Sequence, residues 1–353
     1  MKLALIGLPQ VGKRTLFRLL VGQVANPAGG VSLGLARVRD ARFDRLVEMY
    51  HPKKVTPAQI TCALLPDLEQ QGERNAPIFK ELEQVDAICH LVRVFPDETV
   101  FHVEGSVDPR RDIVAFHEEL QFSDMLFAEK RLERLDRERG KKVDAQKAAL
   151  EADLLARMKE HLEAGRPLRS FVFTDAEEKV IASYPLLTRK PVIQVLNVGE
   201  DQLHDAGLMD RLAAEFADQA FQWISVSAKI EEEISQLSPE EREAFLKALQ
   251  VDQPALDRLT LLCYNTLGLL SFFTVGPDEV RAWTIRRGAL APQAARAIHE
   301  DLERGFIRAE VMRYPDLMEL GSEQKLKEAG RFMQKGKDYV VEDGDIVNIL
   351  FKV

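Results

Sequence analysis

The chain has 353 residues, of which 46% are hydrophobic and 30% are charged, and its formal net charge is −9. This length allows two or three domains, and the composition is that of an ordinary soluble protein. The negative charge excludes a general attraction to nucleic acid, so any RNA contact would need a local basic patch.

The chain shows no sign of membrane insertion or secretion. No apolar run approaches the length of a membrane span, and the N-terminus begins with a strand-like run instead of a signal peptide. The cysteines Cys62, Cys89 and Cys263 lie far apart without metal-ligand spacing, which favours buried thiols in a reducing compartment. We therefore expect a cytoplasmic protein without a membrane partner.

The segment 7–15 reads Gly-Leu-Pro-Gln-Val-Gly-Lys-Arg-Thr and lies between a strand-like run, 2–6, and a helix-like run, 16–20. This is the context of a Walker A phosphate-binding loop. The two glycines let backbone N–H groups point at a β-phosphate, the helix dipole favours the anion, and the lysine reaches the β- and γ-phosphate oxygens. The pattern favours a nucleotide site over a chance glycine-rich turn. The residues that we predict to contact the nucleotide here are Gly7, Pro9, Gln10, Val11, Gly12, Lys13, Arg14 and Thr15.

One position of this loop departs from the motif. Position 14 should carry a Ser or Thr whose hydroxyl binds Mg²⁺, but this chain has Arg14. The arginine either disables the metal site or replaces the cation in part by pairing with phosphate, and the sequence leaves both alternatives open. The loop therefore predicts nucleotide binding more firmly than metal-assisted hydrolysis, and Mg²⁺ is a doubtful ligand.

The remainder of the first 115 residues, together with a later run near residue 190, predicts an α/β domain. Strand-like runs at 31–38, 59–65, 87–95 and 191–196 are nearly continuous in apolar residues, which is typical of a doubly wound, mostly parallel sheet. A further helical stretch ends at Tyr50. The short segment 26–30 between the first helix and the next strand is expected to be flexible.

Residues from about 113 to 187 are dense in charges and have apolar residues at helical spacing, which predicts an inserted pair of antiparallel helices with Gly140 at the tip. The tip has a basic character. This is either an ordinary solvated surface or a contact for RNA or another acidic partner. The basic residues are Lys130, Arg131, Arg134, Arg137, Arg139, Lys141 and Lys142.

The last part of the chain predicts a separate, small β-grasp-like domain. Short strands are expected at 272–275, 280–285, 307–312, 339–341 and 346–353, with one helix over 291–302. The predicted domains are thus a nucleotide-binding domain of residues 1–115 and 188–269, a helical hairpin of residues 116–187, and a β-grasp domain of residues 270–353.

In order and content these features resemble the Obg-like ATPases, the YchF family of P-loop proteins. The family's loop reads Gly-Leu-Pro-Asn-Val-Gly-Lys-Ser-Thr and differs here only at Gln10 and Arg14. The resemblance extends over nearly the whole chain and implies that the hairpin is a coiled-coil domain, the C-terminal part a TGS domain, and the partner a ribosome or translation factor. Further segments similar to the family lie at 86–93, 102–109, 227–234, 256–259, 280–284, 305–311 and 336–345.

The same resemblance implies a base-binding segment. GTPases use Asn-Lys-x-Asp, whose carboxylate accepts hydrogen bonds from guanine, whereas this chain has Asn197-Val198-Gly199-Glu200 directly after a predicted strand. The Asn-x-x-Glu form implies that ATP or ADP binds in preference to GTP. Asn197, Val198 and Glu200 would lie at the base, with Ser227 and Ala228 on its other side. The alternative for Asn197 is a turn residue that only ends the strand.

Three departures from the family affect the catalytic side. Besides Arg14, the family's Asp-x-Ala-Gly segment is replaced by Ala-Leu-Leu-Pro-Asp-Leu at 63–68, where Pro66 has no N–H to donate. The switch I segment is also shortened around 26–33, with Ser32 as the only nearby hydroxyl. Phosphoryl transfer depends on positioning and on cation stabilisation, so these changes predict weak or absent hydrolysis and no assigned catalytic residue.

Two alternatives remain from the sequence. The chain could be an active ATPase or GTPase that acts as a ribosome-associated switch, in which Arg14 and Asp67 have taken over the lost roles. It could also be a nucleotide-free scaffold for protein or RNA contacts. The seven histidines lie singly and suggest no other catalytic centre.

Overall fold

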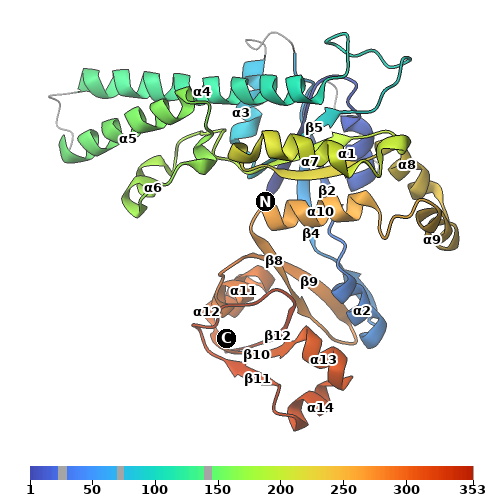
Figure 1. Cartoon of the computed structure of the whole chain (residues 1–353). Coiled ribbons are helices and arrows are strands. Elements are labelled where there is room, and N and C mark those ends of the chain that lie inside the picture. Colours follow the sequence, from blue (N-terminus) through green and yellow to red (C-terminus); the bar gives the residue numbers. More distant parts are fainter. Residues whose placement is uncertain (23–29, 70–74, 139–144, 353) are drawn as a thin grey trace. The chain divides into compact units, whose positions relative to one another are not determined.

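The computed structural model describes residues 1–22, 30–69, 75–138 and 145–352 (Figure 1). The chain forms two compact units. One consists of Met1–Gly34 and Thr61–Leu256, and the other of Leu35–Ile60 and Asp257–Val353. The expected segment 26–30 lies mostly outside the described residues, as does Gly140.

The first unit is built on a sheet with the strand order β2-β4-β1-β5-β6-β7. Strand β1 pairs in parallel with both β4 and β5, and β5–β6 and β6–β7 are also parallel. The loops that follow these parallel strands therefore emerge at one edge of the sheet. The strands are β1 (Lys2–Ile6), β2 (Ser32–Arg37), β4 (Gln59–Leu64), β5 (Ala87–Arg93), β6 (Val192–Asn197) and β7 (Gln222–Val226).

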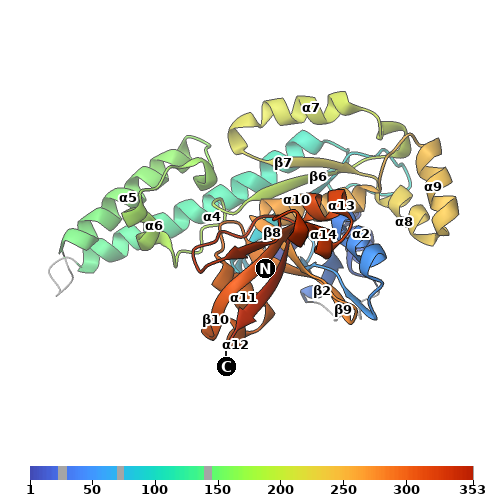
Figure 2. The same ribbon diagram turned by 90° about the horizontal axis from the view of Figure 1, so that it is seen from below.

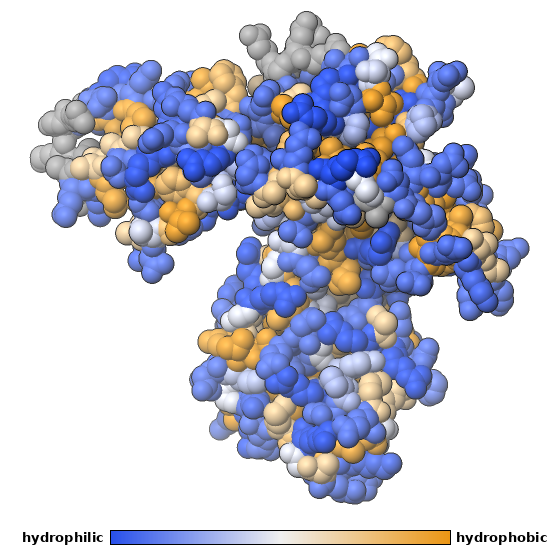
Figure 3. Space-filling model, in the orientation of Figure 1, coloured by the Kyte–Doolittle hydropathy of each residue, from blue (hydrophilic) through white to orange (hydrophobic). Residues whose placement is uncertain are grey.

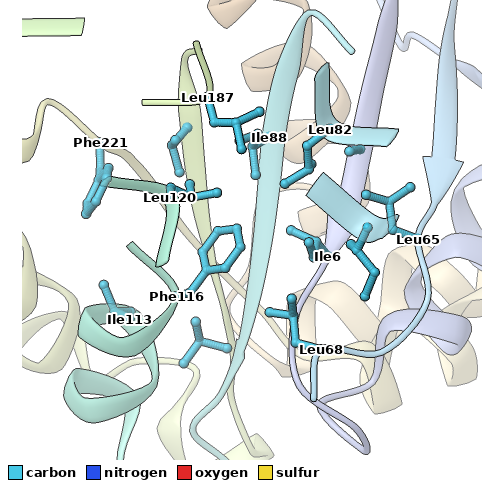
Figure 4. Close-up of a cluster of buried hydrophobic side chains, with 14 of the residues drawn as sticks. Ile6, Leu65, Leu68, Leu82, Ile88, Ile113, Phe116, Leu120, Leu187 and Phe221 are labelled. Atoms are coloured by element: carbon cyan, nitrogen blue, oxygen red, sulfur yellow. The ribbon is translucent and has the colours of Figure 1, made fainter. Parts of the chain in front are cut away.

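The core of this unit explains the apolar runs in the sequence. Every residue of β5 and β6 is buried, as expected for central strands of a parallel sheet. Side chains of these strands pack against helices α3, α4 and α7, and Phe116 of α4 lies among them beside Ile88 and Leu120 (Figure 4). The parallel α/β fold predicted from the sequence is confirmed. The helices of this unit are α1 (Lys13–Val21), α3 (Ala76–Glu83), α4 (Pro109–Glu138), α5 (Ala145–Glu163), α6 (Asp175–Ile181), α7 (Ala206–Glu215), α8 (Ala228–Gln236) and α9 (Pro239–Ala248).

Helices α4 and α5 form the predicted hairpin and lie side by side in both views (Figures 1 and 2). A separate apolar cluster that includes Leu154, Leu155 and Met158 holds them together. Buried Asp124 of α4 joins the hairpin to the chain before β6, because its carboxylate accepts hydrogen bonds from the N–H groups of Leu187 and Thr188.

The basic residues of the hairpin are largely paired where the structure describes them. Arg131, Arg134 and Arg137 lie against carboxylates of Glu151, Glu138 and Glu133. The face of the hairpin in Figure 3 is mainly hydrophilic with scattered apolar residues. Arg139, Lys141 and Lys142 lie outside the described residues, so the predicted RNA contact at the tip stays a prediction.

The second unit contains a mixed sheet with the order β11-β10-β12-β8-β9-β3. Strands β8–β9 and β10–β12 are antiparallel, whereas β12–β8 and β3–β9 are parallel. Helix α11 packs on this sheet through small buried residues, among them Ala291, Ala294 and Ala295. The strands are β3 (Lys54–Thr56), β8 (Leu269–Thr274), β9 (Glu279–Arg286), β10 (Phe306–Arg313), β11 (Met333–Lys335) and β12 (Asp345–Phe351). The helices are α2 (Ala41–Tyr50), α10 (Ala255–Thr266, which begins at the end of the first unit), α11 (Ala291–Ile298), α12 (Glu300–Arg304), α13 (Tyr314–Leu320) and α14 (Glu323–Glu328).

The compact units differ from the predicted domain boundaries in two segments, 35–60 and 257–269, and the first is the larger change. Residues 35–60, expected in the nucleotide-binding domain, belong to the compact unit of the C-terminal part. The cause is a pairing between distant parts of the sequence: β3 adds a parallel strand to β9, and α2 packs on the same strand. Such long-range pairing leaves no periodic signal in the sequence.

Two local predictions in the C-terminal part were also wrong. The expected strand 339–341 is only a bridge between Val340 and Leu290. The expected single helix over 291–302 is broken at His299, which is extended and whose side chain accepts a hydrogen bond from the N–H of Asp301. The histidine therefore caps α12 and ends α11.

No helix in the described parts of the chain has the length and apolar content that are needed to cross a lipid bilayer.

A buried polar chain links β5, β6 and α4 within the core. His90 Nδ1 lies 3.0 Å from Gln194 Oε1, and Gln194 Nε2 lies 2.6 Å from His117 Nε2. The glutamine amide donates to His117, which requires that imidazole nitrogen to be unprotonated. Burial lowers the pKa of His90 to about 3 despite the bond to Gln194, and burial, with Arg169 and His90 nearby, lowers the pKa of His117 well below its usual value.

We predict that these histidines make the protein acid-sensitive. Below about pH 6.5 the unfolded chain protonates both imidazoles while the folded chain does not, so the free energy of unfolding falls as the pH falls. The shifted pKa of His90 alone should lower the free energy of unfolding by roughly 2 kcal/mol between about pH 6.5 and pH 5. Urea unfolding at a series of pH values measures this.

The comparison of variants isolates the effect from other titrating groups. His90→Gln should weaken the dependence of the unfolding free energy on pH, and His204→Gln, at an exposed histidine, should not change it. An unaltered slope in His90→Gln would contradict the prediction.

Candidate functional site

The predicted phosphate loop follows β1 at the sheet edge where the parallel strands end. Gly7 lies so close to β5 that a Cβ on it would stand 2.3 Å from the carbonyl oxygen of Leu91. Gly12 has φ 94°, and a Cβ on it would stand 2.4 Å from the side-chain nitrogen of Asn197. Both glycines are therefore required by the close packing around the loop, in agreement with the motif.

The loop ends at the N-terminus of α1. Gly12 is the N-cap residue, and no side chain among the described residues caps this helix. The first N–H groups of a helix have no partner within it, so Lys13, Arg14 and Thr15 present backbone donors at the end of the loop. The positive end of the helix dipole adds to them, which makes this position suited to a phosphate.

Lys13 is buried, with 3% of its side chain exposed, and its ammonium group has three oxygen partners. Its Nζ donates to the carbonyl oxygens of Gly7, at 2.5 Å, and Pro66, at 3.2 Å, and lies 2.8 Å from a carboxylate oxygen of Asp67. Burial lowers the pKa of Lys13, the bond to Asp67 opposes this, and the nearby charge of Arg14 lowers it further. The lysine is thus placed at the loop and held on the side of β4.

The other loop residues occupy varied environments. Val11 is buried, Pro9 and Thr15 are half-buried, and Gln10 is exposed with φ 60° at the crest of the loop. Arg14 is exposed, and no described residue pairs with its guanidinium. The side chain therefore makes no ion pair across the loop with the part of the chain that the structure describes.

Asn197 connects three segments of the site. Its side chain is 4% exposed, its Nδ2 donates to the carbonyl oxygen of Val11 at 2.9 Å, and its Oδ1 accepts from the N–H of Ala228 at 3.0 Å. Both polar atoms of this amide are therefore used within the protein. Asn197 positions the phosphate loop against the loop after β7, so its role is more than that of a turn residue.

The other residues expected at the base lie around this asparagine. Val198 is buried and joins β7 through a hydrogen bond from its N–H to Val226, and Ser227 and Ala228 are buried at the start of α8. Glu200 is exposed at the beginning of the short helix Glu200–Gln202. The structure thus brings the loop 7–15 and the segments 197–200 and 227–228 together at one edge of the sheet.

Among the residues that the structure describes, those around the phosphate loop differ from the ligands expected for a resident Mg²⁺ ion. Position 14 has no hydroxyl, the loop after β4 offers Pro66 and Asp67, and the Asp67 carboxylate is bound to Lys13. Ser32 is buried in β2. The part of the chain that the structure describes contains no group of three or more His, Cys, Asp or Glu side chains that could hold a metal ion.

The pairing of Asp67 with Lys13 was not assigned from the sequence. The aspartate was noted there only as a possible substitute for a lost catalytic role. Its position after β4, the strand beside β1, is the one available signal, because loops after neighbouring parallel strands lie close together.

Comparisons with known proteins agree with this geometry. The "Ribosome-binding ATPase YchF" of Bacillus subtilis (strain 168) is 38% identical over 362 residues, which cover 99% of this chain and 98% of that protein. The "Obg-like ATPase 1" of Saccharomyces cerevisiae is 38% identical over 369 residues, which cover 98% of this chain and 93% of that protein. This chain belongs to the Obg-like ATPase (YchF) family.

Structure and domain comparisons support this membership. The structure of the Schizosaccharomyces pombe YchF GTPase matches with a TM-score of 0.87 and 33% identity, covering 99% of this chain and 97% of that chain. A family model described as "YchF-GTPase_C: Protein of unknown function (DUF933)" matches residues 269–352. The resemblance to the YchF family inferred from the motifs is confirmed.

We predict that Asn197→Ala destabilises this YchF-family protein by roughly 2–4 kcal/mol, because it leaves the buried carbonyl of Val11 and N–H of Ala228 without partners. Asn197→Asp retains the acceptor for Ala228 but places a buried carboxylate oxygen against the carbonyl oxygen of Val11, so it should be at least as destabilising as Asn197→Ala. Urea unfolding measures both.

The control is Asn348→Ala. This exposed asparagine makes one surface hydrogen bond to Glu310, so its removal should cost less than about 0.5 kcal/mol. Equal losses at positions 197 and 348 would show that the bridge does not stabilise the site.

Proposed function

We propose that this YchF-family protein binds a purine nucleotide in the loop Gly7–Thr15, with ATP or ADP preferred over GTP and with weak or absent hydrolysis, and that it associates with the ribosome. The main observation behind the proposal is the uncapped helix N-terminus at Gly12 with the buried Lys13 beside it. Backbone donors and a lysine in this arrangement are the elements with which P-loops bind the β-phosphate.

The preference for adenine rests on the segment Asn197–Glu200. Discrimination for guanine needs a carboxylate fixed at the base, and a hydrogen bond to such a charged partner is worth roughly 1.5–3 kcal/mol, or tenfold or more in affinity. Glu200 is exposed, and no side chain in the described regions holds its carboxylate in place. A glutamate carboxylate that is not held in place at the base adds little to the affinity for guanine over adenine.

Weak hydrolysis follows from what surrounds the terminal phosphate. The transition state of phosphoryl transfer needs cations and donors around the transferred group. Here Pro66 offers no N–H, position 14 offers no hydroxyl, and the carboxylate of Asp67 adds a negative charge. The relatives are named ATPases, so hydrolysis by this chain is the alternative that the experiment must address.

We predict that ADP binds to the full-length protein in isothermal titration, with or without Mg²⁺, and that GDP binds at least tenfold more weakly. Lys13→Met should reduce the affinity for ADP at least tenfold, because it removes the ammonium group from the loop. Lys179→Met, at an exposed lysine of α6, is the matched control.

The outcomes separate the alternatives. If no nucleotide gives binding heat at millimolar concentration, the remaining alternative is a nucleotide-free scaffold for protein or RNA contacts. Rapid, Mg²⁺-dependent phosphate release from ATP would instead support an active ATPase.

Ribosome association is proposed from the names of the relatives, which include ribosome-binding ATPases from Bacillus subtilis and Haemophilus influenzae. Arg134 and Arg137 of the hairpin are exposed and paired with carboxylates, and such exposed pairs are weak and easily exchanged for phosphate contacts. The hairpin therefore remains the segment that we propose to contact ribosomal RNA.

We predict that the protein sediments with purified ribosomes and dissociates as salt is raised, because phosphate contacts release counterions. Arg134→Glu should reduce this association several-fold. Arg45→Glu is a matched control, since both side chains are similarly exposed, at 68% and 64%, and pair with a glutamate on their own helix. Equal effects of both substitutions would argue against the hairpin.

A further inference from the structure

The carboxylate of Asp67 already occupies an anion position on the lysine of the phosphate loop. Lys13 donates hydrogen bonds to the carbonyl oxygens of Gly7 and Pro66 and forms an ion pair with Asp67, so an incoming nucleotide must displace at least one of these acceptors. Two of them are neutral carbonyls. The third is a charged group at 2.8 Å, the stronger kind of partner for an ammonium ion.

The order of the strands shows which phosphate this carboxylate replaces. Asn197 and Glu200, at the proposed base site, follow β6, while the phosphate loop follows β1 and Asp67 follows β4. In the sheet β4 and β6 lie on opposite sides of β1, with β5 between β1 and β6. A nucleotide with its base near β6 therefore extends its phosphates across the loop, and the terminal phosphate points toward β4 and Asp67.

The backbone around Asp67 has few free N–H groups that could donate to a terminal phosphate. Pro66 has no N–H, and the N–H of Leu68 donates to the carbonyl oxygen of Gly7. The side of the loop that faces β4 therefore has the negative charge of Asp67. It has no free N–H group at positions 66 and 68. The side that receives the β-phosphate retains the N–H groups at the start of α1.

We propose that Asp67 is a specificity-determining residue that takes the place of the γ-phosphate on Lys13 and makes the site selective for a nucleoside diphosphate over a triphosphate. A diphosphate needs only the carbonyl acceptors of Lys13 to give way, and the ion pair with Asp67 is retained. A triphosphate brings its γ-phosphate against the carboxylate and must expel it from the lysine. Asp67 is 39% exposed, so it can move into solvent, at a cost in affinity that falls on the triphosphate alone.

This inference rests on the proposed nucleotide-binding function. The test measures the affinities of the full-length protein for ADP and ATP by isothermal titration, with Mg²⁺ and with EDTA. Four forms are compared: the unaltered chain, two variants of Asp67, of which the first is Asp67→Asn, and Asp218→Asn as a control at an exposed aspartate of the same unit. Asp67→Ala is the second variant, and thermal unfolding verifies that each form is folded.

We expect the unaltered chain and Asp218→Asn to bind ADP at least tenfold more tightly than ATP. In Asp67→Asn and Asp67→Ala the two affinities should come within about threefold, mainly because ATP binds more tightly. Equal affinities for ADP and ATP in the unaltered chain, or a preference unchanged by both Asp67 substitutions, would overturn this inference and leave the proposed function intact. Failure of every form to bind any nucleotide would overturn both.

Discussion

The candidate site depends on the close packing of the phosphate loop against the ends of β5 and β6. Gly7 touches the backbone of β5, and Gly12 touches Asn197 at the end of β6, so neither position has room for a side chain. The side-chain amide of Asn197 connects Val11 with Ala228 through two hydrogen bonds. Because the loop is clamped in this way, the N–H groups at the start of α1 are presented in a fixed direction before any ligand arrives.

At the end of the phosphate loop that faces β4, the charged groups differ from those that hydrolysis of a nucleoside triphosphate requires. Lys13 is buried and neutralised by a carboxylate from the same protein, in a loop where the family resemblance implies a glycine N–H. Arg14 points into solvent in place of a metal-binding hydroxyl. The loop has thus kept the geometry that binds the inner phosphates and lost groups that serve the outer one. Retained binding with weakened catalysis is consistent with both changes.

The buried parts of the molecule were predictable to different degrees. Strands β5 and β6 were evident because their residues are all buried and most of them are apolar. The hairpin of α4 and α5 was evident from its helical periodicity. By contrast, β3 is a strand of three residues whose partner β9 lies over two hundred positions away, and no local pattern indicates such a pairing. For this reason nothing in the sequence indicated that residues 35–60 fall in the compact unit of the C-terminal part.

The sequence by itself determined the P-loop, the α/β class, the helical insertion and the family, because each is written in the order of apolar runs, glycines and motif residues along the chain. Tertiary structure decided which groups meet at the site. Asp67 and Lys13 are separated by more than fifty residues and become partners only because β4 and β1 are adjacent in a parallel sheet. The charge balance of the phosphate site therefore depends on strand order, which hydrogen bonding and side-chain packing fix only in the folded chain.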